Sequence, residues 1–177
     1  MIAASAVRAP GASSSIAVGL GELAVARADT PDGPQLVAYG LGSCVAICLF
    51  EARSGVAGMA HVVLPGESPH GEPNARFARN ALAALREAMV KIGGPADLRR
   101  YQARIAGGAQ VLVISGGGSL PRVGDRNIES VRDELVRAAI PLLGEHVGGG
   151  KGRTVWFNPR DLGRIRVRTV GGPELVF

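Results

Sequence analysis

The sequence lacks the features that mark several large classes of protein. Only 4% of its 177 residues are aromatic, and it has two cysteines, Cys44 and Cys48. No apolar run approaches the roughly 20 residues that are needed to span a bilayer. Residues 1–15 contain no continuous apolar segment and do not resemble a secretory signal, so we expect a flexible N-terminal tail and a cytoplasmic protein.

The usual patterns of metal and nucleotide sites are missing as well. Neither cysteine has further Cys or His residues at zinc-ligand spacing, and the same holds for His70 and His146, so we expect no metal. The glycine runs 107–108 and 116–118 are not followed by Lys-Ser or Lys-Thr, as a P-loop requires, so we expect no cofactor. We interpret both runs as turns, and the first also indicates a bulge or a close backbone approach.

Acidic residues are in the minority, with fifteen against twenty basic ones and a net charge of +5. Such an excess suits an acidic partner or nucleic acid when it is clustered. The arginines are instead spread over residues 99–104 and 160–168, without aromatic residues between them that would stack on bases. This pattern favours a solvated face, and we expect no nucleic-acid binding.

Glycine is abundant, at 26 residues, and predicts many tight turns. We expect one helix capped by Asn74 and a second capped by Asn127, which ends near Ala138 because Pro141 cannot continue it. Apolar patterns predict strands at 16–26, 35–39, 45–50, 56–64, 104–114, 140–146, 154–157 and 164–170. Since helices and strands do not alternate regularly, we predict a single α+β domain over residues 16–177, a mixed or antiparallel β-sheet sandwich flanked by helices.

Cys44 lies in a pattern that is typical of a reactive thiol. Gly40-Leu-Gly-Ser-Cys44 provides a glycine turn directly before residues 45–50, which are apolar at every position, as in a strand buried on both faces. The thiol would therefore lie at the mouth of a buried strand. The backbone amides of Gly42, Ser43 and Cys44 would converge there as donors for an oxyanion.

His61 is the candidate base. If strands 45–50 and 56–64 form a hairpin that turns around residues 52–53, Cys44 and His61 lie directly opposite each other, with β carbons about 4.5–5.5 Å apart. An adjacent imidazole would lower the pKa of the thiol and later protonate a leaving amine. By itself, a Cys and a His at this spacing give weak support, and a buried structural cysteine is the alternative.

Cys48 is expected to be a core residue, and two amide residues are candidates for the substrate cleft. On one strand, Cys48 would lie about 13 Å from Cys44, at roughly 3.3 Å per residue, which is too far for a disulfide and indicates a reducing compartment. Cys48 would share the face of Cys44 but point into the core. Gln110 and Asn127 are candidate substrate-cleft residues, although helix capping is the favoured role of Asn127.

Several stretches of the sequence resemble the CheD family of chemoreceptor glutamine deamidases. They are Gly40-Leu-Gly-Ser-Cys-Val-Ala-Ile-Cys-Leu-Phe50, Gly58-Met-Ala-His-Val-Val-Leu-Pro65, Gly107-Gly-Ala109, Val123-Gly-Asp-Arg-Asn127, and Gly148-Gly followed by Gly152-Arg153. The resemblance extends in order from Ile16 to Val170 and leaves out the tail and residues 115–121. It implies a CheD-like cysteine hydrolase fold of the α+β class, as in certain glutamine-deamidating toxins.

The resemblance also implies a reaction. Cys44 would be the nucleophile and His61 its base, and glutamine side chains of chemoreceptor cytoplasmic helices would become glutamate through a Cys44 thioester, with loss of ammonia. The family's third polar residue, a threonine, falls on Ala38, which cannot accept the second N–H of the imidazole. A backbone carbonyl or a water would then have to orient the ring, or activity is reduced.

Two functions of different class remain. The cysteine, the histidine and the glycine turn favour the protein-glutamine deamidase. Ala38 favours a low-activity or inactive adaptor that keeps the fold and binds receptor helices or a CheC-type phosphatase. Alkylation distinguishes them, because an activated Cys44 thiolate would react much faster than Cys48.

Overall fold

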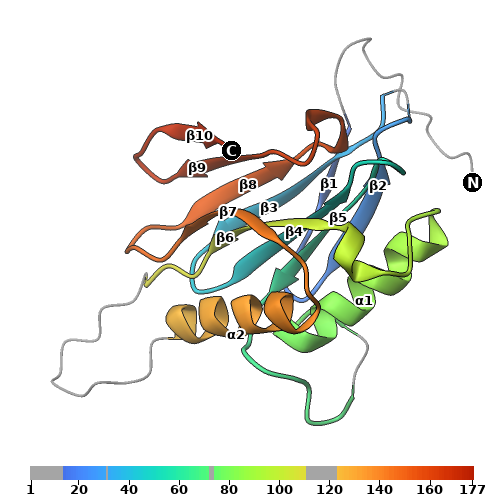
Figure 1. Ribbon diagram of the computed structural model, residues 1–177. Coiled ribbons are helices and arrows are strands. Elements are labelled where there is room, and N and C mark those ends of the chain that lie inside the picture. The colour runs from blue at the N-terminus through green and yellow to red at the C-terminus, as the bar shows by residue number, and fades with distance from the viewer. Residues whose placement is uncertain (1–13, 31, 72–73, 111–122) are drawn as a thin grey trace, which may run out of the picture.

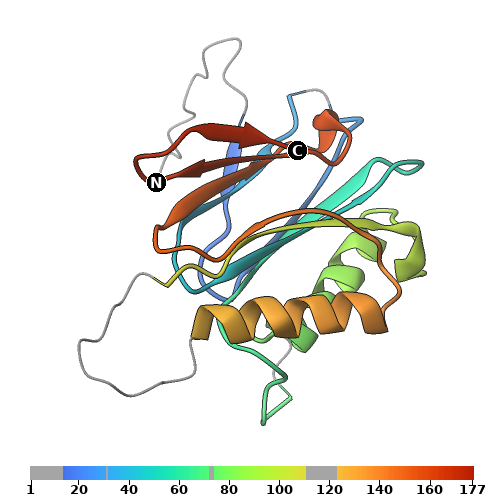
Figure 2. The same ribbon diagram turned by 60° about the vertical axis from the view of Figure 1, so that its left-hand side comes forward.

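The computed structural model describes residues 14–30, 32–71, 74–110 and 123–177. In this part of the chain, ten strands form two five-stranded sheets, and two α-helices lie along one side of the pair (Figures 1 and 2). The elements are β1 (Ser15–Ala17), β2 (Leu23–Arg27), β3 (Gln35–Leu41), β4 (Val45–Glu51), β5 (Val56–Val62), α1 (Ala78–Lys91), η1 (Leu98–Arg100), β6 (Gln102–Gly107), α2 (Val123–Arg137), β7 (Leu142–Val147), β8 (Arg153–Phe157), η2 (Pro159–Asp161), β9 (Ile165–Thr169) and β10 (Glu174–Val176). The predicted α+β class is confirmed.

The two sheets form a sandwich with the helices on one side. The sheet that we call the outer sheet has the order β1-β3-β8-β9-β10, and the inner sheet has the order β2-β5-β4-β6-β7. The pairs β1–β3 and β6–β7 are parallel and the others are antiparallel, so both sheets are mixed. The inner sheet lies between the outer sheet and the two helices (Figure 2).

The inner sheet is covered on both faces, and β4 is its central strand. All seven residues of β4 are buried, as the continuous apolar run predicts. Val45 and Ile47 belong to the apolar cluster that also contains Leu85 of α1, on the helix side. Cys44 and Cys48 belong to the second cluster, which lies between the sheets. The predicted sharing of one face by the two cysteines is therefore confirmed.

Neither helix begins at its predicted asparagine cap. The N-cap of α1 is Phe77, and no side chain caps this helix. The Leu64 carbonyl acts as the cap instead, because it accepts the Ala78 N–H at 3.2 Å. Asn74 closes a turn just before the helix, where its side chain accepts the Arg76 N–H at 3.1 Å. In the second helix, four residues of α2 precede Asn127, so this residue lies inside the helix.

The hairpin between β4 and β5 has a longer turn than predicted. Glu51 pairs with Val56, which leaves four residues in the turn. The Glu51 carboxylate closes this turn by accepting the Ser54 N–H at 2.7 Å. Because the turn is two residues longer than predicted, each β4 residue pairs with a β5 residue two positions later in the sequence. Cys44 and His61 therefore do not lie directly opposite each other, and that prediction is wrong.

The terminal strands also depart from prediction. The strand expected at 16–26 is divided into β1 and β2, because the chain turns at Gly21 with a φ of 73°. β1 begins at Ser15, inside the expected tail, while residues 1–13 lie outside the described residues. Residues 111–114 of the strand expected at 104–114, and the glycine run 116–118, also lie outside them. The sequence analysis did not predict β10.

The positive charge concentrates near the C-terminus. Residues 151–177 include six basic and two acidic residues, which accounts for four of the five net charges. Trp156 of β8 lies under Arg166 and Arg168 of β9, whose guanidinium carbons are 4.6 and 5.2 Å from the ring centroid. This contact was not predicted, because Trp156 precedes these arginines by ten residues or more and only strand pairing brings them together.

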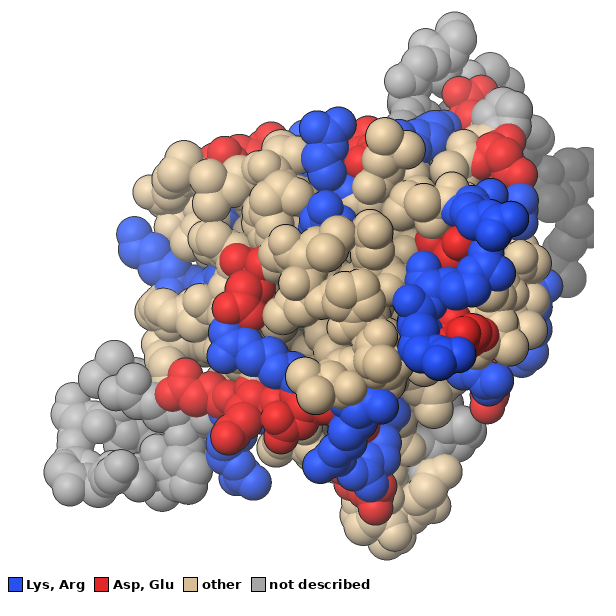
Figure 3. Space-filling view, in the orientation of Figure 1, with Lys and Arg blue, Asp and Glu red and all other residues tan. Residues whose placement is uncertain are grey.

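Elsewhere the charges alternate in sign. On the face in Figure 3, basic and acidic side chains lie interspersed, and acidic side chains gather over α2, which contains Asp125, Glu129, Asp133 and Glu134. This face has no continuous basic groove. Within the described ranges, neither α1 nor α2 has the length and apolar character of a bilayer-spanning helix.

Candidate active site

Cys44 lies in the loop between β3 and β4, directly before the first residue of β4. Its exposed fraction is 9%, whereas that of Cys48 is 1%. Both are free thiols, which confirms that they form no disulfide. The position at the mouth of a buried strand is the predicted one, and it leaves only Cys44 with a path to solvent.

Glycines allow two chain segments to meet at this loop. Gly40 has a φ of 63°, in the left-handed region that favours glycine. Gly107, at the end of β6, lies so close that a β carbon there would be 2.1 Å from the Cys44 carbonyl oxygen. The close backbone approach predicted at residues 107–108 is confirmed, and no residue with a side chain fits at Gly107.

Three successive carbonyls of the Cys44 loop accept hydrogen bonds from the body of the protein. The donors are the Ala109 N–H for Gly42 O at 2.6 Å, the Asn127 side-chain amide for Ser43 O at 2.9 Å, and the Gly108 N–H for Cys44 O at 2.7 Å. The C=O and N–H of one peptide unit point in opposite directions. The Ser43 and Cys44 N–H groups therefore point away from these donors, and neither has an acceptor among the described residues.

His61 is held in one tautomer by a backbone carbonyl. It lies on β5, its exposed fraction is 3%, and its Nδ1 is 3.0 Å from Val18 O. A carbonyl oxygen can only accept, so the proton of the neutral ring is on Nδ1 and Nε2 carries a free lone pair. Nε2 is buried and has no partner among the described residues. This is the tautomer that a general base requires.

The cysteine and the histidine are diagonal neighbours. Ala46 lies opposite His61 in the β4–β5 ladder, and Cys44 precedes Ala46 by two residues. Cys44 and Ala46 belong to the same cluster between the sheets, so the thiol is on the face of the sheet that carries the imidazole. Diagonal neighbours in such a ladder have α carbons about 7–8 Å apart and closer β carbons. The observed strand register therefore keeps the thiol and the imidazole close together. They are diagonal neighbours and not the directly opposite pair that was predicted.

Burial favours the neutral form of both groups. It raises the pKa of the Cys44 thiol, against the opposing effect of the residue's own backbone N–H. It lowers the pKa of His61, against the opposing hydrogen bond to the Val18 carbonyl. The expected lowering of the thiol pKa is therefore wrong for the resting protein. A neutral thiol and a neutral imidazole suit proton transfer during attack, not before it.

Ala38 occupies the position where the family resemblance leads us to expect a threonine. It is fully buried and belongs to the same cluster between the sheets as Cys44. The Val18 carbonyl orients the imidazole instead, which is one of the two substitutes that the sequence analysis named. Val18 is itself fixed, because its N–H donates to Val37 O of β3 at 2.8 Å.

The two candidate cleft amides have different positions. Asn127 is fully buried, and besides Ser43 O its Nδ2 donates to Val63 O at 2.9 Å. Its predicted capping role is wrong, because its side chain bonds to the Cys44 loop and the end of β5. The Gln110 N–H donates to Gly149 O at 2.7 Å, and its side-chain Nε2 is buried without a partner among the described residues. Only Asn127 is tied by its side chain to the reactive loop.

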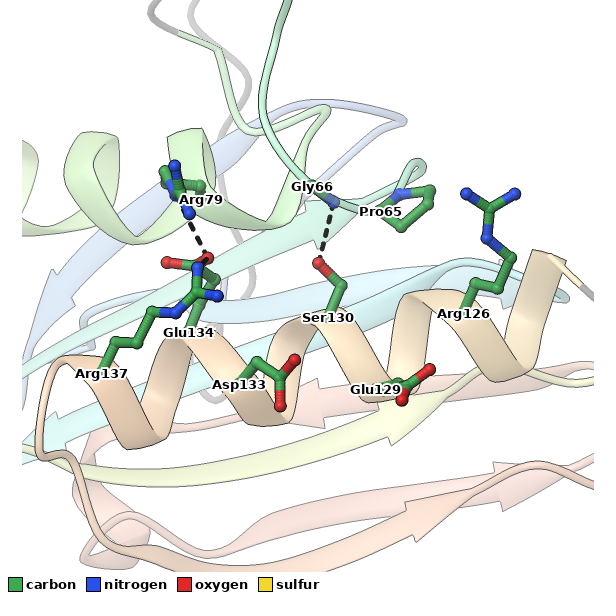
Figure 4. Close-up of a pocket in the computed structure, with 9 residues that line it drawn as sticks. All are labelled: Pro65, Gly66, Arg79, Arg126, Glu129, Ser130, Asp133, Glu134 and Arg137. Carbon is green, nitrogen blue, oxygen red and sulfur yellow. Dashed lines mark hydrogen bonds and ion pairs between the residues drawn. The ribbon is translucent and has the colours of Figure 1, made fainter.

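A pocket of about 310 Å³ opens beside α1 and α2 (Figure 4). Three of its six charged side chains form ion pairs, since Glu134 accepts from Arg79 at 3.2 Å and from Arg137 at 2.7 Å. Neither Cys44 nor His61 lines it. We therefore assign the pocket no part in the chemistry. In the described ranges, no three side chains of His, Cys, Asp or Glu gather as metal ligands.

Comparison with known proteins identifies relatives along most of the chain. The CheD family model, described as CheD chemotactic sensory transduction, matches residues 63–169. A protein of Desulfitobacterium hafniense (strain DSM 10664 / DCB-2), named probable chemoreceptor glutamine deamidase CheD, is 39% identical over 163 residues, which cover 91% of this chain and 97% of the relative.

Two further relatives come from other organisms. The probable chemoreceptor glutamine deamidase CheD of Archaeoglobus fulgidus is 40% identical over 162 residues, or 92% of this chain and 98% of the relative. The chemoreceptor glutamine deamidase CheD of Thermotoga maritima is 37% identical over 157 residues, or 89% and 93%. With a family match over more than half of its residues and such relatives along most of its length, the chain belongs to the CheD family.

Proposed function

We propose that this chain is a chemoreceptor glutamine deamidase in which Cys44 is the nucleophile and His61 the general base. The relatives are named for that activity. The observation that carries the residue assignment is the free lone pair of His61 Nε2. It lies on the same side of the inner sheet as the more exposed of the two cysteines.

The first half-reaction forms a thioester. The Cys44 sulfur attacks the side-chain amide carbon of a receptor glutamine while the thiol proton passes to His61 Nε2. The amide oxygen becomes an oxyanion on a tetrahedral carbon. The imidazolium then gives the proton to the amide nitrogen, the carbon–nitrogen bond breaks, and ammonia leaves. The glutamyl side chain remains bonded to Cys44.

The second half-reaction restores the enzyme. A water oxygen attacks the thioester carbon and gives a proton to His61 Nε2. The carbon–sulfur bond breaks, the Cys44 sulfur recovers the proton from the imidazolium, and the receptor side chain leaves as a carboxylic acid. This acid gives its proton to solvent or to the released ammonia and becomes glutamate. Atoms and protons balance with water as the co-substrate, and no redox change occurs.

Backbone donors in the Cys44 loop would hold the oxyanion. We expected the backbone amides of Gly42, Ser43 and Cys44 to supply them. The held carbonyls of this loop turn the N–H groups of Ser43 and Cys44 outward, which favours these two as the oxyanion donors. Such donors act strongly because they are in place before charge develops.

The fold and location follow from the same proposal. We assign the two-sheet arrangement to a CheD-like cysteine hydrolase fold, and the single domain to residues 16–177. A substrate on cytoplasmic receptor helices implies a cytoplasmic protein. Gln110 remains a candidate cleft residue, since it directly follows Ala109, whose N–H holds the Cys44 loop.

An adaptor that binds receptor helices or a CheC-type phosphatase is the second candidate function, and Ala38 is the observation that favours it. The deamidase has the stronger support, because the Val18 carbonyl performs the orienting role that an alanine side chain cannot. Binding of a CheC-type partner is compatible with either function.

Peptide mass spectrometry tests the enzyme directly. The purified chain is incubated with a chemoreceptor cytoplasmic fragment, and conversion of glutamine to glutamate is followed with time. We expect conversion by the wild type, and a loss of about 10⁴-fold or more in Cys44→Ala, because removal of a nucleophile eliminates the covalent route. Cys48→Ala makes the same change four residues away and should retain activity.

The outcomes separate the two functions. If Cys44→Ala converts the fragment as fast as wild type, the thioester mechanism is wrong. If the wild type binds the fragment without converting any glutamine, the adaptor is the function.

A further inference from the structure

The side chain of Asn127 joins the chain segments that carry the catalytic pair. Nδ2 directs its two hydrogens at Ser43 O and Val63 O, each at 2.9 Å. Since both of these neighbours are acceptors, the atom between them is the amide nitrogen, which fixes the orientation of the side chain. Ser43 directly precedes Cys44, and Val63 follows His61 by two residues.

This bridge lies where the strand pairing stops. The last pair of the β4–β5 ladder is Val45 with Val62. Beyond that pair, the Asn127 amide bonds to one carbonyl from each side and takes the place of the next rung. Its two hydrogen bonds therefore set the distance between the Cys44 loop and the end of β5.

The Asn127 amide also determines the direction of the Cys44 N–H. The Ser43 C=O and the Cys44 N–H belong to one peptide unit and point in opposite directions. Because the carbonyl is held toward α2, the N–H is turned away from α2. An N–H held in this way is in place before charge develops on a substrate oxygen.

The contact between α2 and the chain that follows β6 needs two glycines. A β carbon at Gly124 would be 2.5 Å from the Gly108 carbonyl oxygen, and one at Gly108 would be 2.4 Å from the Ile128 side chain. These close approaches bring the second turn of α2 within reach of Ser43. A helix further away could not place an asparagine there.

The hydrogen bonding of Asn127 is incomplete in a way that stability does not explain. Its Oδ1 is buried without a partner among the described residues. An unpaired buried carbonyl opposes folding by about 1–3 kcal/mol, which partly offsets the two bonds made by Nδ2. The net effect of this side chain on stability is therefore small. Its main consequence is the precise placement of the two carbonyls.

From these contacts we propose that Asn127 is a positioning residue for the deamidation. It holds the Ser43 and Val63 carbonyls, and so aims the Cys44 N–H at the oxyanion and sets the separation of nucleophile and base. The inference rests on the proposed roles of Cys44 and His61. It extends them to a residue that touches neither the substrate nor the reacting atoms.

Asn127→Ala is the test variant, and Val131→Ala is its matched control. Val131 lies one turn further along the same face of α2, is equally buried, and packs in the cluster on the helix side of the inner sheet. Both variants lose side-chain packing in the same helix, but only Asn127→Ala releases the carbonyls. Thermal unfolding establishes that both are folded at the assay temperature.

Two readouts separate positioning from stability. With the receptor fragment, we expect Asn127→Ala to lose about 10–100-fold in kcat with KM within about threefold, while Val131→Ala keeps kcat within about threefold. Without any substrate, we measure the rate of Cys44 labelling by iodoacetamide against pH. We expect the midpoint to rise by about half a pH unit or more in Asn127→Ala and to stay constant in Val131→Ala.

The labelling profile distinguishes failure of this inference from failure of the deamidase. If the midpoint and kcat of folded Asn127→Ala match those of Val131→Ala, Asn127 is only structural. If the midpoint shifts but the wild type deamidates nothing, the positioning stands and the proposed reaction fails. Asn127→Ser, a smaller change that also cannot reach both carbonyls, replaces Asn127→Ala if the latter does not fold, and the same two readouts decide.

Discussion

Cys44 and Cys48 lie four residues apart on one face of the chain, yet they differ in the properties that determine thiol reactivity. Cys48 pairs with Met59 on one side and with Arg104 on the other, so neighbouring strands enclose it completely. Burial raises its pKa strongly, with only a weaker opposing effect of Arg104. Cys44 lies just outside the ladder, keeps a path to solvent, and has an imidazole diagonally across from it.

The difference shows how the end of a strand becomes a reactive site. Inside the ladder, the backbone N–H groups bond to neighbouring strands and are not available to a substrate. At Cys44 the ladder between β4 and β5 has stopped, and the carbonyls of the loop are held by hydrogen bonds. The Ser43 and Cys44 N–H groups have no acceptor in the part of the chain that the structure describes, although the backbone there is fixed. The same residue type is therefore a core filler at one position and a candidate nucleophile at the other.

Removal of the His61 imidazole should eliminate the general base that distinguishes Cys44 from Cys48. We expect His61→Asn to lower kcat by about 10²–10⁴-fold, because general-base assistance has that magnitude. The asparagine amide nitrogen takes the place of Nδ1 and can still donate to Val18 O, so the fold should persist. The measurement is conversion of the receptor fragment at saturating concentration, with circular dichroism to compare the folds. A variant with the activity of wild type would exclude His61 as the base.

Alkylation compares the two thiols in one molecule. Near neutral pH, iodoacetamide should label Cys44 about 100-fold faster than Cys48 or more, because Cys48 reacts only after the sheets open. Peptide mass spectrometry after timed quenching gives both rates. In concentrated urea the rates should become similar, which serves as the control. Equal and slow labelling in the folded protein would favour the adaptor.

The pH dependence tests the state of the resting pair. Burial lowers the pKa of His61, so the imidazole stays neutral, and able to accept a proton, below its ordinary pKa of 6.5. We expect kcat/KM to decline on the acid side with a midpoint below 6.5, the same for wild type and Cys48→Ala. An acid-side midpoint well above this value would instead indicate that ionisation of the Cys44 thiol controls the rate.

Stability should vary with pH in the same direction. The pKa of His61 is lower in the folded protein than in the unfolded chain, so the unfolded chain binds more protons between the two values. The contribution of a neutral His61 is therefore fully present above pH 6.5 and is lost as the pH falls through the folded pKa. His146, whose pKa burial also lowers, adds an effect of the same sign. His61→Asn should reduce the pH dependence of the unfolding free energy measured with urea, and an unchanged pH dependence would contradict the assignment.

The sequence predicted the parts of the site that depend on local chemistry. The buried strand β4, the glycine turn before it, the shared face of the two cysteines and the close approach at Gly107 all follow from residue types in a short window. The register of the β4–β5 hairpin did not, because it depends on a turn that the Glu51 carboxylate stabilises. A turn of four residues and one of two leave the same alternation of faces.

Contacts between distant segments were beyond local patterns. The role of Val18 depends on a turn that brings the N-terminal segment over His61, and a main-chain carbonyl leaves no mark on the sequence. The residue type alone predicts a cap at Asn127, because asparagine is a common cap. A better signal was its spacing, since Asn127, Val131 and Leu135 form one buried stripe of α2, where a polar residue needs a buried partner.

Ala38→Thr should have the smallest effect of these changes on activity, because it restores a hydroxyl whose role is already filled. The Val18 carbonyl accepts the Nδ1 proton, and Ala38 is fully buried. We expect kcat within about threefold of wild type and a loss of about 1–3 kcal/mol in unfolding free energy, since the larger side chain must fit into a packed interior. Saturating kinetics and urea unfolding measure the two quantities, and labelling of Cys48 should stay as slow as before. If kcat instead rose by about tenfold, a side-chain hydroxyl would orient the ring better than the Val18 carbonyl. Ala38 would then limit the activity of the Cys44–His61 pair.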